Sequence, residues 1–155
     1  MTINPFMARA IELSILNVEA GGGPFGAVIA KDGEVIAEGV NRVTSTNDPT
    51  AHAEMIAIRE ACKKLGQFAL LGCEIYASCE PCPMCLGAIY WARPDRIFFA
   101  NTAADAAEIG FDDEFIYREI QCPHATRKIP MIPMMREQAL VGFRAWEQKG
   151  DKISY

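Results

Sequence analysis

The sequence lacks the features that mark membrane, exported and nucleic-acid-binding proteins. No apolar run approaches the ~18 residues of a membrane span, and residues 1–10 lack the basic-then-apolar layout of a signal peptide. Lys and Arg number 15 against 20 Asp and Glu, so no basic excess is available to bind a phosphate backbone. Linkers, low-complexity tracts and internal repeats are also missing. We therefore expect one domain over residues 1–155, a cytoplasmic location, and neither a membrane nor a nucleic acid as partner.

The composition is that of an ordered globular protein. Of the 155 residues, 50% are hydrophobic and 23% are charged, which excludes a disordered chain. A chain of this length buries roughly two-thirds of its unfolded surface and needs no disulfides to fold. In a reducing compartment, the clustered members of its six cysteines indicate a metal site or catalysis before disulfides.

Periodicity and turn signals predict alternating helices and strands. Helices are expected over residues 3–20, 50–65, 81–91, 103–108, 112–120 and 136–149, and strands over residues 25–30, 34–40, 73–78 and 96–100. Residues 41–47 are expected to form a loop, and residues 129–135, with two prolines, an extended edge. This order predicts an α/β fold with three αβα layers and a partly parallel sheet.

Two short motifs at predicted helix starts carry the candidate chemistry. Cys82 and Cys85 are three residues apart at a proline-marked helix start, which turns both sulfurs to one face. The positive end of a helix favours the thiolate form of cysteine. His52 lies near the start of another helix and can meet the two sulfurs if the helix ends converge. Three such N and S ligands leave one position for water, as in catalytic zinc sites.

Glu54 is the candidate catalytic residue. It lies two residues from His52 and points away from a shared ion, so it is better placed to move protons than to bind metal. The pattern H-x-E followed by P-C-x-x-C is the signature of zinc-dependent deaminases.

Two interpretations in which the protein is not an enzyme stay open. Cys79, Cys82 and Cys85 form C-x₂-C-x₂-C, which is also compatible with part of an iron–sulfur cluster or with a closed structural zinc site in a non-catalytic protein. No fourth cysteine follows with proline in the ferredoxin manner. Cys79 also precedes the helix, at the end of a strand. His52 as a cap and the cysteines as buried hydrophobic residues are the simplest structural alternatives.

The sequence resembles the cytidine deaminase superfamily and, within it, the bacterial guanine deaminase branch. The resemblance covers nearly the whole chain and is carried by residues 23–28, 47–54 and 78–93, with residues 106–120 pointing to guanine. It implies an αβα sandwich around a five-stranded mixed sheet. It also implies one zinc ion on His52, Cys82 and Cys85, with Glu54 as the proton shuttle.

The resemblance also implies a substrate and a partner. In the guanine branch, residues matching Asn41, Asp113 and Tyr155 hold the base, and the C-terminal segment swaps between the subunits of a homodimer. The implied reaction converts guanine to xanthine and ammonia. Phe25, Trp91 and Phe111 are candidate flat walls for a purine, and Ala53 is a further candidate contact. The same chemistry on guanosine, cytosine or adenosine in transfer RNA is the alternative, although the acidic composition argues against RNA.

Overall fold

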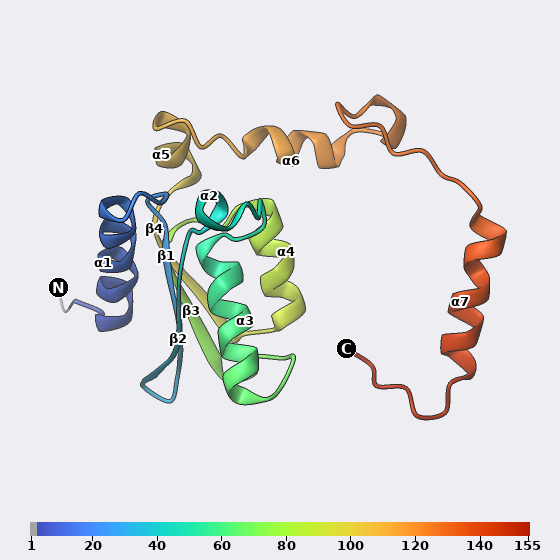
Figure 1. The fold of residues 1–155 in the computed structure, drawn as a ribbon, viewed down its shortest axis with the longest axis horizontal. Helices are drawn as coiled ribbons and strands as arrows, with labels where there is room; N and C mark the ends of the chain where they lie inside the picture. The colour runs from blue at the N-terminus through green and yellow to red at the C-terminus, as the bar shows by residue number, and fades with distance from the viewer. Residues whose placement is uncertain (1–2) are drawn as a thin grey trace. The chain divides into compact units, whose positions relative to one another are not determined.

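The computed structural model describes residues 3–155, which form two compact units, residues 3–114 and Phe115–Tyr155 (Figure 1). The first unit contains α1 (Pro5–Glu19), β1 (Gly26–Lys31), β2 (Glu34–Val40), α2 (Val43–Thr46), α3 (Ala53–Leu65), β3 (Cys73–Cys79), α4 (Pro83–Ala92), β4 (Arg96–Asn101) and α5 (Ala103–Glu108). Helix α6 (Glu114–Gln121) leads into the second unit, which also holds a 3₁₀ turn (His124–Thr126) and α7 (Arg136–Gln148). No helix within residues 3–155 is both long and apolar enough to span a bilayer.

The first unit is built on a mixed sheet with the strand order β2-β1-β3-β4. Strand β1 is antiparallel to β2 and β3, whereas β3 and β4 are parallel, which confirms the partly parallel sheet. The expectation of five strands is wrong, because residues 3–155 form four. Residues 129–135 form no strand, since Pro130 and Pro133 have no N–H to donate to a ladder.

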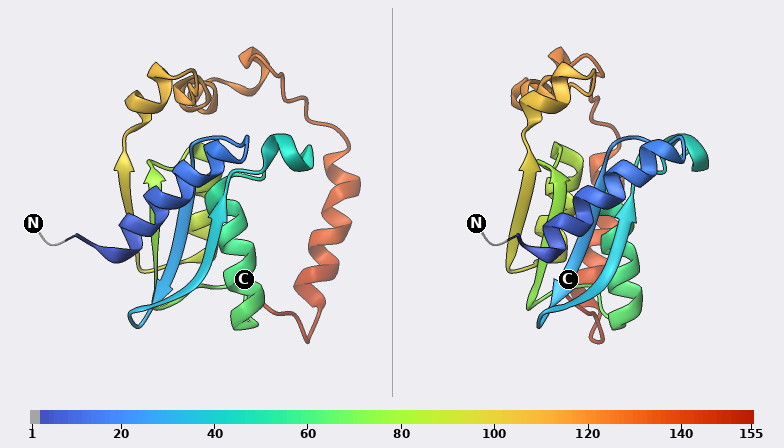
Figure 2. Two further views of the ribbon diagram at one scale, coloured as in Figure 1. Left: turned by 60° about the vertical axis from the view of Figure 1, so that its left-hand side comes forward. Right: turned by 90° about the vertical axis from the view of Figure 1, so that its left-hand side faces the viewer.

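Helices cover both faces of this sheet, so the predicted three layers are confirmed (Figures 1 and 2). Successive residues of β1 point to opposite faces. Val28 and Ala30 pack with Ala10 of α1, in a cluster of buried side chains that also includes Tyr76. Ala27 and Ile29 belong to the second and larger cluster, which includes buried residues of α3 and α4. Burial of these alternating apolar side chains holds the layers together.

Local hydrogen bonding corrects two predicted boundaries. Helix α3 begins at Ala53, three residues later than expected, because Asp48 forms a turn before it. Asp48 Oδ1 accepts hydrogen bonds from Thr50 N (2.8 Å) and Thr50 Oγ1 (2.7 Å). Residues 43–46, expected to be loop, form α2, which ends at Asn47 with a left-handed φ of 53°. His52 is therefore the N-cap residue of α3, with an extended backbone.

The register of the sheet gathers the candidate motifs at one edge. Gly26 at the start of β1 pairs with Val40 at the end of β2, and Cys79 at the end of β3 pairs with Asn101 at the end of β4. Loops that follow β2, β3 and β4, and the loop that precedes β1, therefore meet at this edge. The starts of α3 and α4 both emerge from these loops.

Candidate active site

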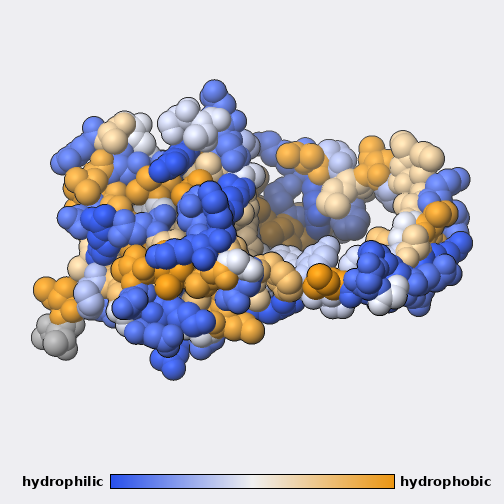
Figure 3. All heavy atoms as spheres, turned by 60° about the horizontal axis from the view of Figure 1, so that its bottom comes forward, coloured by the Kyte–Doolittle hydropathy of each residue, from blue (hydrophilic) through white to orange (hydrophobic). Residues whose placement is uncertain are grey.

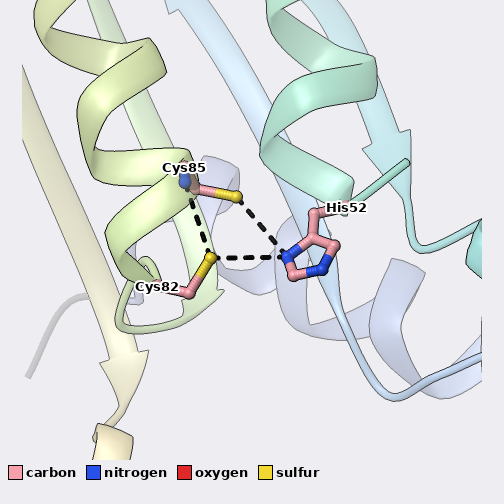
Figure 4. Close-up of side chains that lie close together, drawn as sticks. All are labelled: His52, Cys82 and Cys85. Carbon is pink, nitrogen blue, oxygen red and sulfur yellow. Dashed lines mark hydrogen bonds between the residues drawn. The ribbon is translucent and has the colours of Figure 1, made fainter. Parts of the chain in front are cut away.

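His52, Cys82 and Cys85 converge from the starts of α3 and α4 (Figure 4). Their ligand atoms lie within 4.8 Å of one another, and His52 Nδ1 is 3.5 Å from Cys82 Sγ and 3.6 Å from Cys85 Sγ. Zn–S and Zn–N bonds of about 2.3 and 2.0–2.1 Å in a tetrahedron place S and N roughly 3.6 Å apart. The three side chains therefore fit one zinc ion, which is the cofactor of this protein.

The start of α4 prepares Cys82 for metal binding. Pro83 occupies the first turn, and Cys82 caps the helix with its sulfur accepting from Cys85 N at 3.5 Å. Cys82 and Cys85 are both buried. Hydrogen bonds from the Cys85 side chain and from His52 lower the pKa of the Cys82 thiol to about 4. A thiolate is thus favoured at the cap, which is the form that binds zinc.

Cys79 is separate from this group. It is buried at the end of β3, and its thiol donates a hydrogen bond to the carbonyl oxygen of Thr102 at 3.6 Å. Burial raises the pKa of this thiol to about 11, which disfavours the metal-binding thiolate. Within residues 3–155, the cluster that could hold a metal ion consists of His52, Cys82 and Cys85 and does not include Cys79. The geometry therefore supports an open three-ligand zinc site over the closed and iron–sulfur alternatives.

Glu54 lies in the first turn of α3 with 8% of its surface exposed. Burial raises the pKa of its carboxyl group, because the charged form loses hydration there. A buried carboxyl beside a metal site can take up and release protons during a reaction.

A cavity of about 390 Å³ opens beside these residues. It is lined by Gly21, Gly22, Gly23, Phe25, Asn41, Val43, Thr44, Pro49, His52, Glu54, Cys79, Glu80, Cys82, Ala106, Phe111 and Asp113. The volume is in the range of roughly 300–1,000 Å³ that small-molecule sites occupy. Phe25 and Phe111 form a T-shaped pair in its wall, with ring centroids 4.9 Å apart and an interplanar angle of 89°. Burial is the main cause that raises the pKa of Asp113.

The structure brings only some of the predicted substrate contacts to this cavity. Asn41, Asp113 and Phe25 line it together with Glu54. Trp91 lies at the end of α4 with 64% of its surface exposed, and Ala53 is buried in the core. Neither is among the lining residues, so their roles stay predictions. Tyr155 belongs to the second unit, and its role also stays a prediction.

The sequence prediction missed part of the lining. Glycines 21–23 fall between the helix predicted over residues 3–20 and the strand predicted over residues 25–30, and all three line the cavity. Val43 and Thr44 also line the cavity, although the sequence predicts only a loop at residues 41–47 and no contact from these two side chains. A glycine run next to a motif is the one sequence signal that could have suggested the first group, because glycine allows close approach to a ligand.

The family model for the cytidine and deoxycytidylate deaminase zinc-binding region matches residues 1–101. The chain belongs to this family. The match includes the sheet, the three candidate zinc ligands and Glu54, so the family model and the geometry both indicate a zinc-binding deaminase site.

Individual relatives show which members of this family the chain resembles over its whole length. The chain is 56% identical to guanine deaminase of Bacillus subtilis (strain 168), over the whole length of both proteins. It superposes on the X-ray structure of guanine deaminase from Bacillus subtilis with a TM-score of 0.96, covering 100% of this chain and 99% of that one. The tRNA-specific adenosine deaminase of Aquifex aeolicus (strain VF5) is 48% identical, but the alignment covers 61% of this chain and 63% of that protein. A structure of guanine deaminase from Nitrosomonas europaea superposes with a TM-score of 0.68 at 36% identity, and the superposition covers 73% of this chain and 67% of that chain.

Proposed function

We infer that this chain is an enzyme that hydrolytically deaminates guanine, with zinc as its cofactor, to give xanthine and ammonia. The observation that carries this inference is the buried Glu54 beside the His52, Cys82 and Cys85 group, in a cavity of small-molecule size. Similarity over the full length to a guanine deaminase selects the base, because the transfer RNA deaminase aligns with only 61% of the chain.

The chain's own residues supply the proton transfers. Zinc bound at this site supplies a water that is activated as a nucleophile near neutral pH. Glu54 accepts a proton from the attacking water and donates it to ring N3, which makes C2 of guanine electrophilic. Glu54 then accepts the proton of the hydroxyl group formed at C2 and donates it to the amine, which leaves as ammonia while C2 becomes the carbonyl carbon of xanthine. Its burial raises the pKa of the carboxyl group, which favours alternation between the charged and protonated forms.

Asn41 and Asp113 are proposed to recognise the polar edge of the base. Asn41 Oδ1 accepts a hydrogen bond from Val43 N at 3.2 Å, which fixes the amide and leaves its NH₂ group to donate to a base acceptor. The Asp113 carboxylate accepts from a ring N–H. Phe25 and Phe111 supply flat apolar surface for the purine. Sites built on such hydrogen bonds discriminate strongly against analogues that lack them.

Ammonia release from guanine, guanosine, cytosine and adenine, measured in parallel with zinc-loaded protein, tests the proposed function. We expect the highest kcat/KM on guanine. A preference for guanosine or cytosine would move the activity to the alternative substrates, and adenosine in a transfer RNA substrate serves as the fifth arm. An absence of zinc and of turnover, together with visible absorbance, would instead indicate an iron–sulfur protein.

The Asp113→Asn variant tests the base contact. We expect kcat/KM on guanine to fall by about tenfold or more, because a charged hydrogen bond typically contributes about 1.5–3 kcal/mol. Zinc content should not change. Asp112→Asn is the matched control, since Asp112 is exposed and its Oδ1 accepts from Glu114 N at 3.0 Å, which an amide oxygen can also do. Equal efficiency of the Asp113 variant and its control would remove Asp113 from the site.

A homodimer with an exchanged C-terminal segment is also proposed, so that residues 1–155 form one domain completed by a neighbour. Helix α7 has no buried residue, and Val141 and Phe143 are largely exposed on it. Figure 3 shows hydrophobic residues exposed between hydrophilic ones on the face it draws. Apolar helix residues that are left in water favour association with a second copy. We place the enzyme in the cytoplasm, because Cys82 and Cys85 must stay reduced to bind zinc.

Deletion of residues 151–155 tests the proposed role of the C-terminal segment. The prediction is that zinc content and fold persist while kcat/KM on guanine falls about tenfold or more, since imperfect closure of a site is costly. Tyr155→Phe is the matched variant that keeps the aromatic ring and removes only the hydroxyl group. Full activity of the truncated protein would show that the segment does not cover the site.

A further inference from the structure

Asn17, near the end of α1, links two segments that line the cavity. Its side-chain Nδ2 donates to the carbonyl oxygen of Gly23 at 2.8 Å and to that of Asn41 at 2.9 Å. The two hydrogens of this amide group thus bind main-chain acceptors at positions 23 and 41, which are 18 residues apart in the sequence. Asn17 is not itself among the residues that line the cavity.

The glycine loop is packed directly against this side chain. Gly22 N donates to the main-chain carbonyl of Asn17 at 2.8 Å. A Cβ atom added to Gly22 would lie 2.4 Å from Asn17 Nδ2 and 2.8 Å from Asn17 Cγ, far inside van der Waals contact. The carbonyl oxygen of Gly23 also accepts from Phe25 N at 2.8 Å. The loop that leads to Phe25 is therefore held on one side by its own turn and on the other by Asn17.

The same amide reaches the segment that carries the proposed base contact. Asn41 N donates to the carbonyl oxygen of Phe25 at 3.2 Å, and the next residue, Arg42, donates from its N to the carbonyl oxygen of Ala51 at 2.8 Å. The main chain at Asn41 is thus fixed by Phe25 and by Asn17, and it is tied to the residue before His52. Within these contacts, Asn17 is the one side chain that joins the glycine loop to Asn41.

We propose that Asn17 is a positioning residue for the purine site: it sets the spacing between the glycine loop with Phe25 and the recognition side chain Asn41. This inference rests on the proposed function, since it concerns how the same cavity holds its base. Asn17 acts through its two main-chain hydrogen bonds. The zinc ligands and Glu54 are reached only indirectly, so its effect falls on substrate binding.

Asn17→Asp and Asn17→Ser test the proposal. Aspartate has the shape of asparagine but cannot donate to either carbonyl, and serine is too short to bridge both. Loss of two neutral hydrogen bonds predicts a KM for guanine about 5- to 20-fold higher. We expect kcat to stay within about twofold and zinc to stay at one ion per subunit. Asn4→Asp is the control for charge, because Asn4 Oδ1 accepts from Phe6 N and Met7 N at the first turn of the same helix and Asn4 does not line the cavity.

Gly22→Ala tests the same contact with Asn17 in place, so the proposal remains testable if the Asn17 variants fold poorly. The added methyl group displaces the amide, and KM should rise as in Asn17→Ser. The double variant Asn17→Ser with Gly22→Ala should be no worse than Asn17→Ser alone, because serine removes the clash.

Three outcomes would overturn the proposal. They are an unchanged KM in the Asn17 variants, a loss of zinc and kcat at unchanged KM, and additive effects in the double variant. The unaltered protein separates this proposal from the function itself. If that protein does not deaminate guanine, the proposed function fails, whereas normal turnover with an unchanged KM in the variants removes only the role of Asn17.

Discussion

Glu54→Gln is expected to keep zinc bound and to lower kcat on guanine by about 10²–10⁴-fold, the usual contribution of general acid–base catalysis. Glutamine keeps the shape of the side chain but cannot take up a proton. The three proposed zinc ligands are untouched, and they come from His52 and the start of α4. The effect should lie near the upper end of this range, because the same carboxyl group serves several proton transfers in the proposed reaction.

Glu60→Gln is the matched control for this prediction. Glu60 lies on the same helix, α3, but is exposed, whereas Glu54 is buried. Zinc content by metal analysis and kcat from ammonia release should be measured for both variants. If Glu54→Gln retains activity comparable to that of Glu60→Gln, Glu54 is not the proton shuttle.

Cys85→Ala is expected to lose zinc and activity together. Cys85 is fully buried, and its sulfur is one of three donors that face a single point. A catalytic zinc site uses three protein ligands, so a site with two should not retain the ion. Even loss of a group that only supports a ligand costs about 10–100-fold, and we therefore expect turnover below about one per cent of normal. Cys82→Ala should behave in the same way.

Cys79→Ala separates the open zinc site from a closed one. The Cys79 thiol donates to Thr102 O rather than facing the donor group, so this variant should keep one zinc ion per subunit. Release of zinc from Cys79→Ala would support a closed four-ligand site. Stoichiometric zinc in Cys85→Ala would show that the proposed ligand set is wrong.

Much of the local structure could be predicted because it depends on neighbouring residues. The prolines mark the start of α4 to within two residues, since the helix begins at Pro83 and not at 81, and Gly66, with a φ of 65°, ends α3 where the sequence predicts. The start of α3 could not be placed in the same way. The Asp48-Pro49 pair is typical of a helix start, but the turn that Asp48 forms with Thr50 postpones the helix to Ala53.

The sequence by itself determined the chemistry of this protein. The types and spacings of His52, Glu54, Cys82 and Cys85 predict zinc donors and a separate proton carrier, because those properties belong to side chains and to helix starts a few residues long. It also determined the alternation of helix and strand that predicts three layers.

Only the tertiary structure decided which side chains share one cavity. The ends of β3 and β4 meet through pairing of residues more than 20 positions apart, and the β1–β3 register joins residues about 50 apart. The tertiary structure also separates Cys79 from the donor group, brings Asn41 and Asp113 to one cavity, and gives residues 3–155 a sheet of four strands. It also places Asn17 between the glycine loop and Asn41, a role with no local signal. Such pairings depend on packing across the whole sheet, which no short stretch of sequence encodes.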